Sequence, residues 1–373
     1  MSDSGTSIAA VGLTLAALAA GPLGLAFAQQ PAAHIGEVVP HDVRQIYDRG
    51  LRFLAATQSQ DGSWDGGKPG PAMTQGLENA AQADGSWASG GKQQAGVTAL
   101  ALLAFLASGE DANFGIYSGH IRKALRSLIG TQDANTGYFG PSMYHHGFAM
   151  LALAEAYGAV DERTLWPDET APRSVGQALE LAVRAAITAQ KSNPTNAWRY
   201  SPGAQDADAS VAGAVIIGLL AARNAGIEVP DESIDKAIAY LRSMTERSGE
   251  VAYMNLGDRL AHSTARVSIA SLTYAVARRK DLAEFKATLD YLKQRIGEPS
   301  GPFGEYTDYY EAQALFQGAP HSWEKWNESL VRRLKNAQQP DGSIRGRFNP
   351  AISTSLALLS LALNYRFLPI YER

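Results

Sequence analysis

Two aspartates, Asp206 and Asp208, lie one residue apart in the stretch QDADASVAGAVIIGLLAA, directly before a long uncharged segment. An aspartate at the start of a helix can accept hydrogen bonds from the first backbone N–H groups, which stabilises the helix by about 1 kcal/mol and keeps the carboxylate ionised. An aspartate buried beside a second carboxylate instead holds its proton near neutral pH and can act as an acid. The two roles shift the pKa of Asp208 in opposite directions, and the sequence leaves both open.

Other polar and aromatic residues stand near the starts of similar uncharged segments. They are Tyr144, His145, His146, Trp198, His262, Arg266, Asp308, Tyr309, Tyr310 and Glu311. His262 or His145 could orient a protonated Asp208, and aromatic side chains such as Phe148 could stabilise a carbocation through their ring faces. Hydrogen-bonded histidines and core aromatics are the alternative interpretation of the same residues.

The pattern does not predict a metal or a cofactor. The adjacent His145 and His146 would point about 100° apart on a helix and would not share a metal ion. Asp206, Asp208 and His262 lack the regular local spacing of a ligand set. We therefore expect neither a metal nor a cofactor.

A turn that combines Gln, Gly and an aromatic or apolar residue recurs along the chain. Its copies are QSQDGSW (58–64), QDANTGYFG (132–140), QKSNPTNAW (190–198), SGEVAY (248–253), SGPFGEY (300–306) and QQPDGSI (338–344). Residues 65–92, which contain a second ADGSW, resemble a long loop insertion. We interpret the turns as structural, with Asp and Gly making the bend and the aromatic residue closing the corner.

Each turn separates two kinds of helical pattern. The segments before the turns place their charges on one face, as solvent-facing helices do: 43–58, 120–132, 174–190, 233–245, 283–296 and 323–338. The segments after the turns are nearly uncharged, as buried helices are: 94–107, 144–158, 209–222, 263–277, 308–318 and 352–365.

Six amphipathic helices can cover six apolar ones on all sides only if they form a ring around them. The sequence therefore predicts an all-α fold, a single closed α6/α6 toroid whose inner helices surround an apolar central cavity. Because the inner helices would run in the same direction, their N-termini would meet at one rim together with the candidate residues named above. Helix N-termini favour anions, so this rim would suit an anionic group as well as a hydrocarbon.

Composition narrows the function. The 373-residue chain has a net charge of -4 and no Lys/Arg-rich block, so we expect no nucleic-acid partner. It has no cysteine, which excludes a thiolate zinc site and a Cys nucleophile. It also lacks a G-x-S-x-G elbow, a P-loop, an H-E-x-x-H helix and a dinucleotide fingerprint.

The N-terminal segment predicts export. Residues 8–28 are apolar and end in Ala26-Phe27-Ala28, an A-x-A-like cleavage site, so residues 1–28 are predicted to be a signal peptide. No Lys or Arg precedes the run, which leaves an uncleaved membrane anchor as the alternative. Residues 29–41 would be a linker and 42–373 the toroid, in a periplasmic or secreted protein.

The turns QSQDGSW and QQPDGSI resemble the QW-type turns of squalene cyclases, and the alternating helices resemble the terpenoid cyclase/protein prenyltransferase toroid over about residues 42–368. The C-terminal part is similar to bacterial prenyltransferase/squalene oxidase repeat proteins. In such cyclases the proton donor lies in a D-x-D-D motif at the start of an inner helix. The resemblance implies Asp208 as donor and Asp206 as its support, with Ala209 at the third motif position.

Three hypotheses follow. The first is a terpenoid-cyclase-like enzyme that starts cyclisation of an isoprenoid with Asp208 as acid. The second is a non-catalytic secreted toroid that binds a lipid or a protein partner, since Ala209 breaks the motif and squalene cyclases have two barrels. The third is a periplasmic polysaccharide-active toroid, in which Asp208, Asp308 and Glu311 would be the acid/base candidates. An apolar small molecule or lipid is the expected ligand, with peripheral membrane association and a second protein subunit as further expected partners.

Overall fold

The computed structural model describes residues 39–65, 94–166, 173–256, 263–366, 368 and 370. These residues belong to one compact unit, Val38–Arg373. The predicted signal peptide, the predicted loop insertion beyond Asp65 and His262 lie outside the described residues. Within the described ranges the secondary structure is helical, apart from two isolated β-bridges, Thr245 to Val251 and Gln338 to Ile344.

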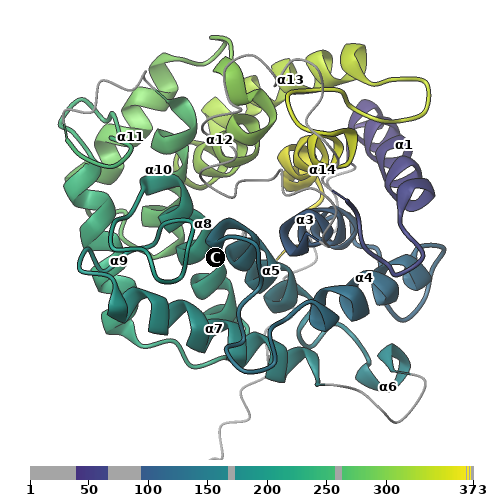
Figure 1. Ribbon diagram of the computed structural model, residues 1–373. Coiled ribbons are helices and arrows are strands. Elements are labelled where there is room, and N and C mark those ends of the chain that lie inside the picture. Colours follow the sequence, from purple (N-terminus) through teal and green to yellow (C-terminus); the bar gives the residue numbers. More distant parts are fainter. Residues whose placement is uncertain are drawn as a thin grey trace, which may run out of the picture. The chain divides into compact units, whose positions relative to one another are not determined.

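Six helices form an inner ring (Figure 1). They are α3 (Ala95–Leu106), α5 (Met143–Ala156), α8 (Ala209–Asn224), α10 (Thr264–Val276), α12 (Gly304–Gly318) and α14 (Pro350–Leu361). Each packs against the next along the chain, and α14 packs against α3, so the ring is closed. Nearly every residue of these helices is buried, as expected for segments without a charged face.

Six further helices surround this ring (Figure 1). They are α1 (His41–Thr57), α4 (Ser118–Gly130), α7 (Val175–Ser192), α9 (Asp231–Met244), α11 (Ala283–Gln294) and α13 (Pro320–Ala337). Each packs against the inner ring, and α13 also contacts α1. The prediction of an all-α α6/α6 toroid is therefore confirmed. Short helical turns, α6 (Glu162–Leu165), η2 (Gly301–Phe303) and η3 (Ala362–Asn364), complete the described structure.

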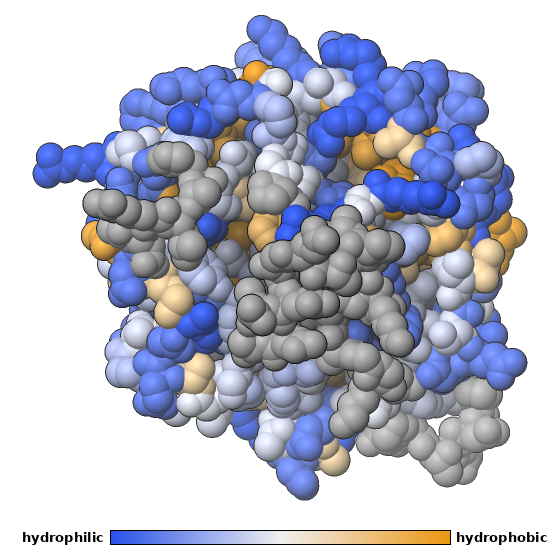
Figure 2. Space-filling model, turned by 45° about the horizontal axis from the view of Figure 1, so that its top comes forward, coloured by the Kyte–Doolittle hydropathy of each residue, from blue (hydrophilic) through white to orange (hydrophobic). Residues whose placement is uncertain are grey.

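The outer helices give the protein a polar surface. Figure 2 shows hydrophilic residues over most of the periphery of the face in view, with apolar residues visible between them. Among the described helices, none combines the length and the apolar character that a membrane span needs.

The recurring turns join neighbouring outer helices through a glutamine. In four of them the side-chain amide donates to a carbonyl of its own turn and to a carbonyl of the next outer helix, at 2.8–3.0 Å. These residues are Gln58, Gln132, Gln190 and Gln338. The last of them donates to Ile46 on α1 and so connects the final turn to the first helix.

Glycine and tryptophan explain the rest of the turn motif. Gly62 has φ +88°, and a Cβ there would lie 2.2 Å from the carbonyl oxygen of Lys123 on α4, so only glycine fits. Trp64 and Trp198 are 1% exposed, and their indole N–H groups donate to the carbonyls of Leu54 and Ala186. The structural interpretation of these turns is confirmed, and it includes the candidate residue Trp198.

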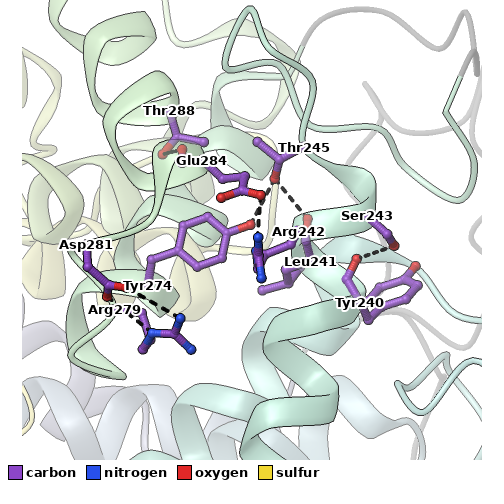
Figure 3. A network of polar contacts seen from close by, with 10 residues as sticks. All are labelled: Tyr240, Leu241, Arg242, Ser243, Thr245, Tyr274, Arg279, Asp281, Glu284 and Thr288. Atoms are coloured by element: carbon purple, nitrogen blue, oxygen red, sulfur yellow. Dashed lines mark hydrogen bonds and ion pairs between the residues drawn. The ribbon is translucent and has the colours of Figure 1, made fainter.

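Hydroxyl groups tie an inner helix to its outer neighbours on the α9 side of the ring (Figure 3). The hydroxyl of Tyr274 on α10 lies 2.9 Å from that of Thr245, which itself donates to the carbonyl of Leu241 on α9. Arg242 on α9 bonds Glu284 on α11 at 3.1 Å. These contacts connect α9, α10 and α11.

Candidate functional site

Asp208 is the N-cap residue of α8. Its Oδ1 accepts hydrogen bonds from the backbone N–H groups of Ser210 and Val211, each at 2.9 Å. The N–H of Ala209 donates to the carbonyl of Tyr253, so three of the first N–H groups of α8 have partners. The capping interpretation is therefore confirmed. Because these N–H groups already have acceptors, they are not available to bind an anion at the N-terminus of α8.

The second carboxylate oxygen of Asp208 is placed differently. Oδ2 is buried and has no hydrogen-bond partner among the described residues, and it forms an ion pair with Nε of Arg199 at 3.5 Å. Burial raises the pKa of Asp208 to about 7, although the capping hydrogen bonds and the charge of Arg199 act in the opposite direction. One carboxyl group thus caps a helix with one oxygen and can hold a proton on the other.

Arg199 is a site residue that the sequence argument missed. Its Nη1 donates to Asp206 at 2.5 Å, and its guanidinium lies near the rings of Tyr200 and Tyr253, at 5.2 and 5.8 Å. The Asp206 side chain is 52% exposed, whereas that of Asp208 is fully buried. The one signal in the sequence was a cation directly after Trp198, at the turn that leads to the two aspartates.

Aromatic side chains near Asp208 contact one another across the circle of inner helices. The ring of Tyr144 on α5 lies 6.3 Å from that of Tyr306 on α12, and the ring of Phe148 lies 6.1 Å from that of Tyr309. In the inner ring α5 and α12 are opposite each other, because two inner helices separate them in either direction. At this level aromatic side chains from opposite inner helices meet inside the ring.

The inner helices α5 and α8 pack closely against each other. Gly147 on α5 faces the backbone of α8, where an added Cβ would lie 2.7 Å from the carbonyl oxygen of Ala214. Gly218 on α8 faces the carbonyl of Gly147 at the same distance. Glycine at these two positions therefore allows the close approach of α5 and α8.

Two predicted rim residues, Asp308 and Glu311, lie elsewhere. The guanidinium of Arg333 on α13 donates to both oxygens of Asp308, at 2.8 and 3.0 Å, and Ser300 donates to it as well. Burial raises the pKa of Glu311 to about 7, and the neighbouring charge of Asp308 adds to the effect. The helix α12 begins at Gly304 and not at residue 308, so both carboxyls lie in its second turn. They face the outer helix α13 and are not part of the group around Asp208.

The same shift in helix start brings other residues of α12 to the site. Tyr306, which the sequence argument did not select, lies in the first turn, and its ring is 5.0 Å from that of Tyr310. Tyr309 and Tyr310 are both 1% exposed. These two candidates therefore belong to the aromatic cluster beside Asp208.

The adjacent histidines have structural partners. His146 accepts the N–H of Phe139 at Nδ1, and its Nε2 lies 2.9 Å from the carbonyl of Ala182. Nδ1 of His145 accepts the N–H of Gly96 at the start of α3. Burial lowers the pKa of His145 to about 3 and of His146 to about 4, so both are neutral.

Arg266 lies close to the site but not at the acid. Its Nε donates to the carbonyl of Val251 at 2.9 Å, and its guanidinium lies 5.9 Å from the ring of Tyr253. His262, the second proposed orienter, is outside the described residues. Within the described ranges no group of three or more His, Asp or Glu side chains could hold a metal ion.

Comparison with known proteins supports the fold. No known protein family and no curated protein matches this sequence. Among solved structures, an inactive variant of the α-1,6-mannanase GH76A of Salegentibacter sp. HEL1_6, in complex with α-1,6-mannotriose, superposes with a TM-score of 0.60 at 11% identity, over 86% of this chain and 99% of its own. The type II terpene cyclase MstE from Scytonema superposes with a TM-score of 0.56 at 14% identity, over 88% and 99%.

A variant of the same cyclase in complex with its substrate geranylgeranyl dihydroxybenzoate gives a TM-score of 0.57 at 13% identity, over 88% of this chain and 98% of the variant. At such identities the likeness is one of fold. The chain is thus an α/α toroid of the class that includes type II terpene cyclases and GH76 mannanases. The single ring of this chain superposes on nearly the whole of the MstE chain.

Proposed function

We propose that this protein is a terpenoid-cyclase-like enzyme in which Asp208 starts the cyclisation of an isoprenoid by protonating an alkene. The observation that carries the proposal is the fully buried Asp208 carboxyl, whose pKa is raised to about 7 by burial and whose Oδ2 lacks a hydrogen-bond partner among the residues that the structure describes. Such a group is neutral in a large fraction of molecules near neutral pH and sits in a site without bulk water. Both are conditions for acid catalysis on a hydrocarbon.

The proposed reaction is an isomerisation that consumes no co-reactant. The proton of Asp208 forms a C–H bond with one alkene carbon, and the other carbon becomes a cation that the next double bond attacks. Loss of a proton from the final cation gives the cyclic product and restores the proton balance. The enzyme must therefore supply an acid and a lining that tolerates positive charge.

The aromatic cluster can supply that lining. Burial raises the pKa of Tyr144 and of Tyr306, and the nearby charge of Asp208 adds to both shifts. Both tyrosines therefore lie within range of the Asp208 charge, and aromatic faces attract cations. Because rings from α5 and α12 meet, a substrate reaches Asp208 only when some of these side chains change rotamer, which makes binding by induced fit part of the proposal.

The mannanase neighbours keep a polysaccharide-active enzyme as a second candidate, since their chains share this fold. A glycosidase of the usual kind needs two carboxyl groups that flank a glycosidic bond. Here Asp206 is paired with Arg199, and Asp308 and Glu311 face α13. These placements give the sugar reaction less support than the cyclisation. Export and a lipid partner remain predictions from the sequence.

The test compares two substitutions of one residue. Asn caps helices about as well as Asp but cannot donate a carboxyl proton, whereas Ala at a cap costs about 1 kcal/mol. Asp208→Asn should therefore keep the melting temperature and abolish cyclic products from polyprenyl substrates, as measured by gas chromatography and mass spectrometry. Asp208→Ala should lose both product and stability. Undiminished product from Asp208→Asn would disprove the assignment of the acid.

A further inference from the structure

Arg199 stands between two carboxyl groups of unequal exposure. Its Nη1 donates to the half-exposed Asp206 at 2.5 Å, while its Nε stays 3.5 Å from Oδ2 of the buried Asp208. The guanidinium is planar and rigid, so a bond at one nitrogen restricts where the others can lie. Asp206 thus has a direct effect on how closely Arg199 approaches the acid.

Aromatic contacts restrict the guanidinium further. It lies 5.2 Å from the ring of Tyr200 and 5.8 Å from that of Tyr253, and the hydroxyl groups of these tyrosines lie 2.6 Å apart. Within the part of the chain that the structure describes, neither Oδ2 of Asp208 nor Nε of Arg199 has a hydrogen-bond partner, although both are buried. The two groups therefore form an ion pair at 3.5 Å without a hydrogen bond between them, while Asp206 accepts a hydrogen bond from the same guanidinium.

We propose that Asp206 is a positioning residue, which holds Arg199 away from Asp208 so that Oδ2 of Asp208 can carry a proton. The inference rests on the proposed function for its purpose, but the arrangement can be tested without a substrate. It differs from the direct role expected from the sequence, in which the negative charge of Asp206 alone would keep Asp208 protonated. In the new account the effect of Asp206 passes through Arg199.

The groups around Asp208 allow the two accounts to be separated. Those that interact with its charge come from the preceding turn, α5, α9 and α12: Arg199, Asp206, Tyr144, Tyr240 and Tyr306. Burial raises the pKa of each of the three tyrosines, so they stay uncharged near neutral pH. Movement of Arg199 onto Asp208 would turn the present ion pair at 3.5 Å into a shorter, hydrogen-bonded one, which favours the ionised carboxyl and lowers its pKa further.

The experiment is a pH titration of the full-length protein labelled with carbon-13 at the aspartate carboxyl groups, followed by NMR. The Asp208 signal is identified by its absence in Asp208→Asn. Asp206→Asn should lower the Asp208 midpoint by about one pH unit or more, because the released Arg199 moves onto Asp208. Asp206→Glu, which can still hold the arginine, should keep the midpoint near that of the unmodified protein.

The decisive comparison repeats the substitution without the arginine. In Arg199→Met, adding Asp206→Asn should change the Asp208 midpoint by less than about a third of the shift seen with Arg199 present, a coupling that a double-mutant cycle measures. An equal decrease in both backgrounds, or no decrease in the presence of Arg199, would overturn the proposal. Melting temperatures confirm that each variant is folded.

Because no substrate is present, the result is independent of the cyclisation assay. A protein that shows the arginine-dependent shift but forms no cyclic product would refute the proposed function alone. A protein that cyclises isoprenoids but shows no arginine-dependent shift would refute this inference alone.

Discussion

Tyr144 on α5 and Tyr306 on α12 lie with their ring centroids 6.3 Å apart and their planes at 84°, although they come from opposite sides of the inner ring. The charge of Asp208 contributes to the pKa of both. The acid and the aromatic groups that could stabilise a cation therefore form one buried cluster.

The pH dependence of stability should reveal the buried Glu311. Its pKa is raised to about 7 in the folded protein, against about 4.3 in an unfolded chain, so the folded state binds more protons between these values. Its contribution to stability is fully present below about pH 4 and is lost as the pH rises through 7. We expect a loss on the order of 3 kcal/mol from this group, measured by urea unfolding at several pH values.

Glu311→Gln serves as the comparison, because an amide of the same shape does not titrate. This variant should show a smaller decrease in stability between pH 5 and 8 than the unmodified protein, and the remaining decrease should include that of Asp208, whose pKa is also raised. If Glu311→Gln kept the full slope, the assignment to Glu311 would be wrong.

The turn glycines should differ sharply in their tolerance of a side chain. Gly62 and Gly226 both have positive φ, +88° and +95°, but only Gly62 faces a backbone oxygen at 2.2 Å from an added Cβ, while Gly226 has nothing within 4 Å. Gly226→Ala should cost about 1 to 2 kcal/mol from backbone strain alone. Gly62→Ala should cost clearly more, because α4 would have to move as well. Equal losses in chemical denaturation would refute the packing role of the turn.

The ring closure through Gln338 can be tested against its neighbour in the chain. The amide of Gln338 donates to Ile46 on α1 and to Gly342, whereas that of Gln339 donates only to the nearby carbonyl of Ala337. Gln338→Ala leaves two carbonyls without their partner and should cost about 1 to 3 kcal/mol. Gln339→Ala should change the free energy of unfolding by about 0.5 kcal/mol or less. The reverse order in thermal unfolding would show that this contact does not stabilise the ring.

The sequence predicted the fold because the repeat constrains it at several levels. The charged and uncharged helical segments alternate, and the turns between them contain the Gln, Gly and aromatic residues whose contacts are seen in the structure, as for Gln58, Gly62 and Trp64. Local pattern and global packing agree at these positions, and such agreement makes a fold predictable.

The site was less predictable, because it depends on exact helix starts and on contacts between distant segments. The uncharged pattern predicts that α12 begins at residue 308, but the helix begins at Gly304. Tyr306 therefore lies in the first turn at the site, and Asp308 and Glu311 do not. His146, Thr98 and Thr354 have the same structural role: each side chain accepts a backbone N–H from the turn that precedes its inner helix. Because a histidine and a threonine can both fill this role, the residue type does not reveal it. In the sequence Arg199 is marked only as a cation after Trp198, and its distance of 3.5 Å from Asp208 is known only from the structure.

The central claim is that Asp208 delivers a solvent-exchangeable proton to a carbon atom. Cyclisation of a polyprenyl substrate in deuterated water tests this most directly, because the carboxyl proton exchanges with solvent before each turnover. The account predicts one non-exchangeable deuterium in each molecule of cyclic product, found by mass spectrometry, and no product from Asp208→Asn. A cyclic product without deuterium, or the same labelled product from Asp208→Asn, would contradict it.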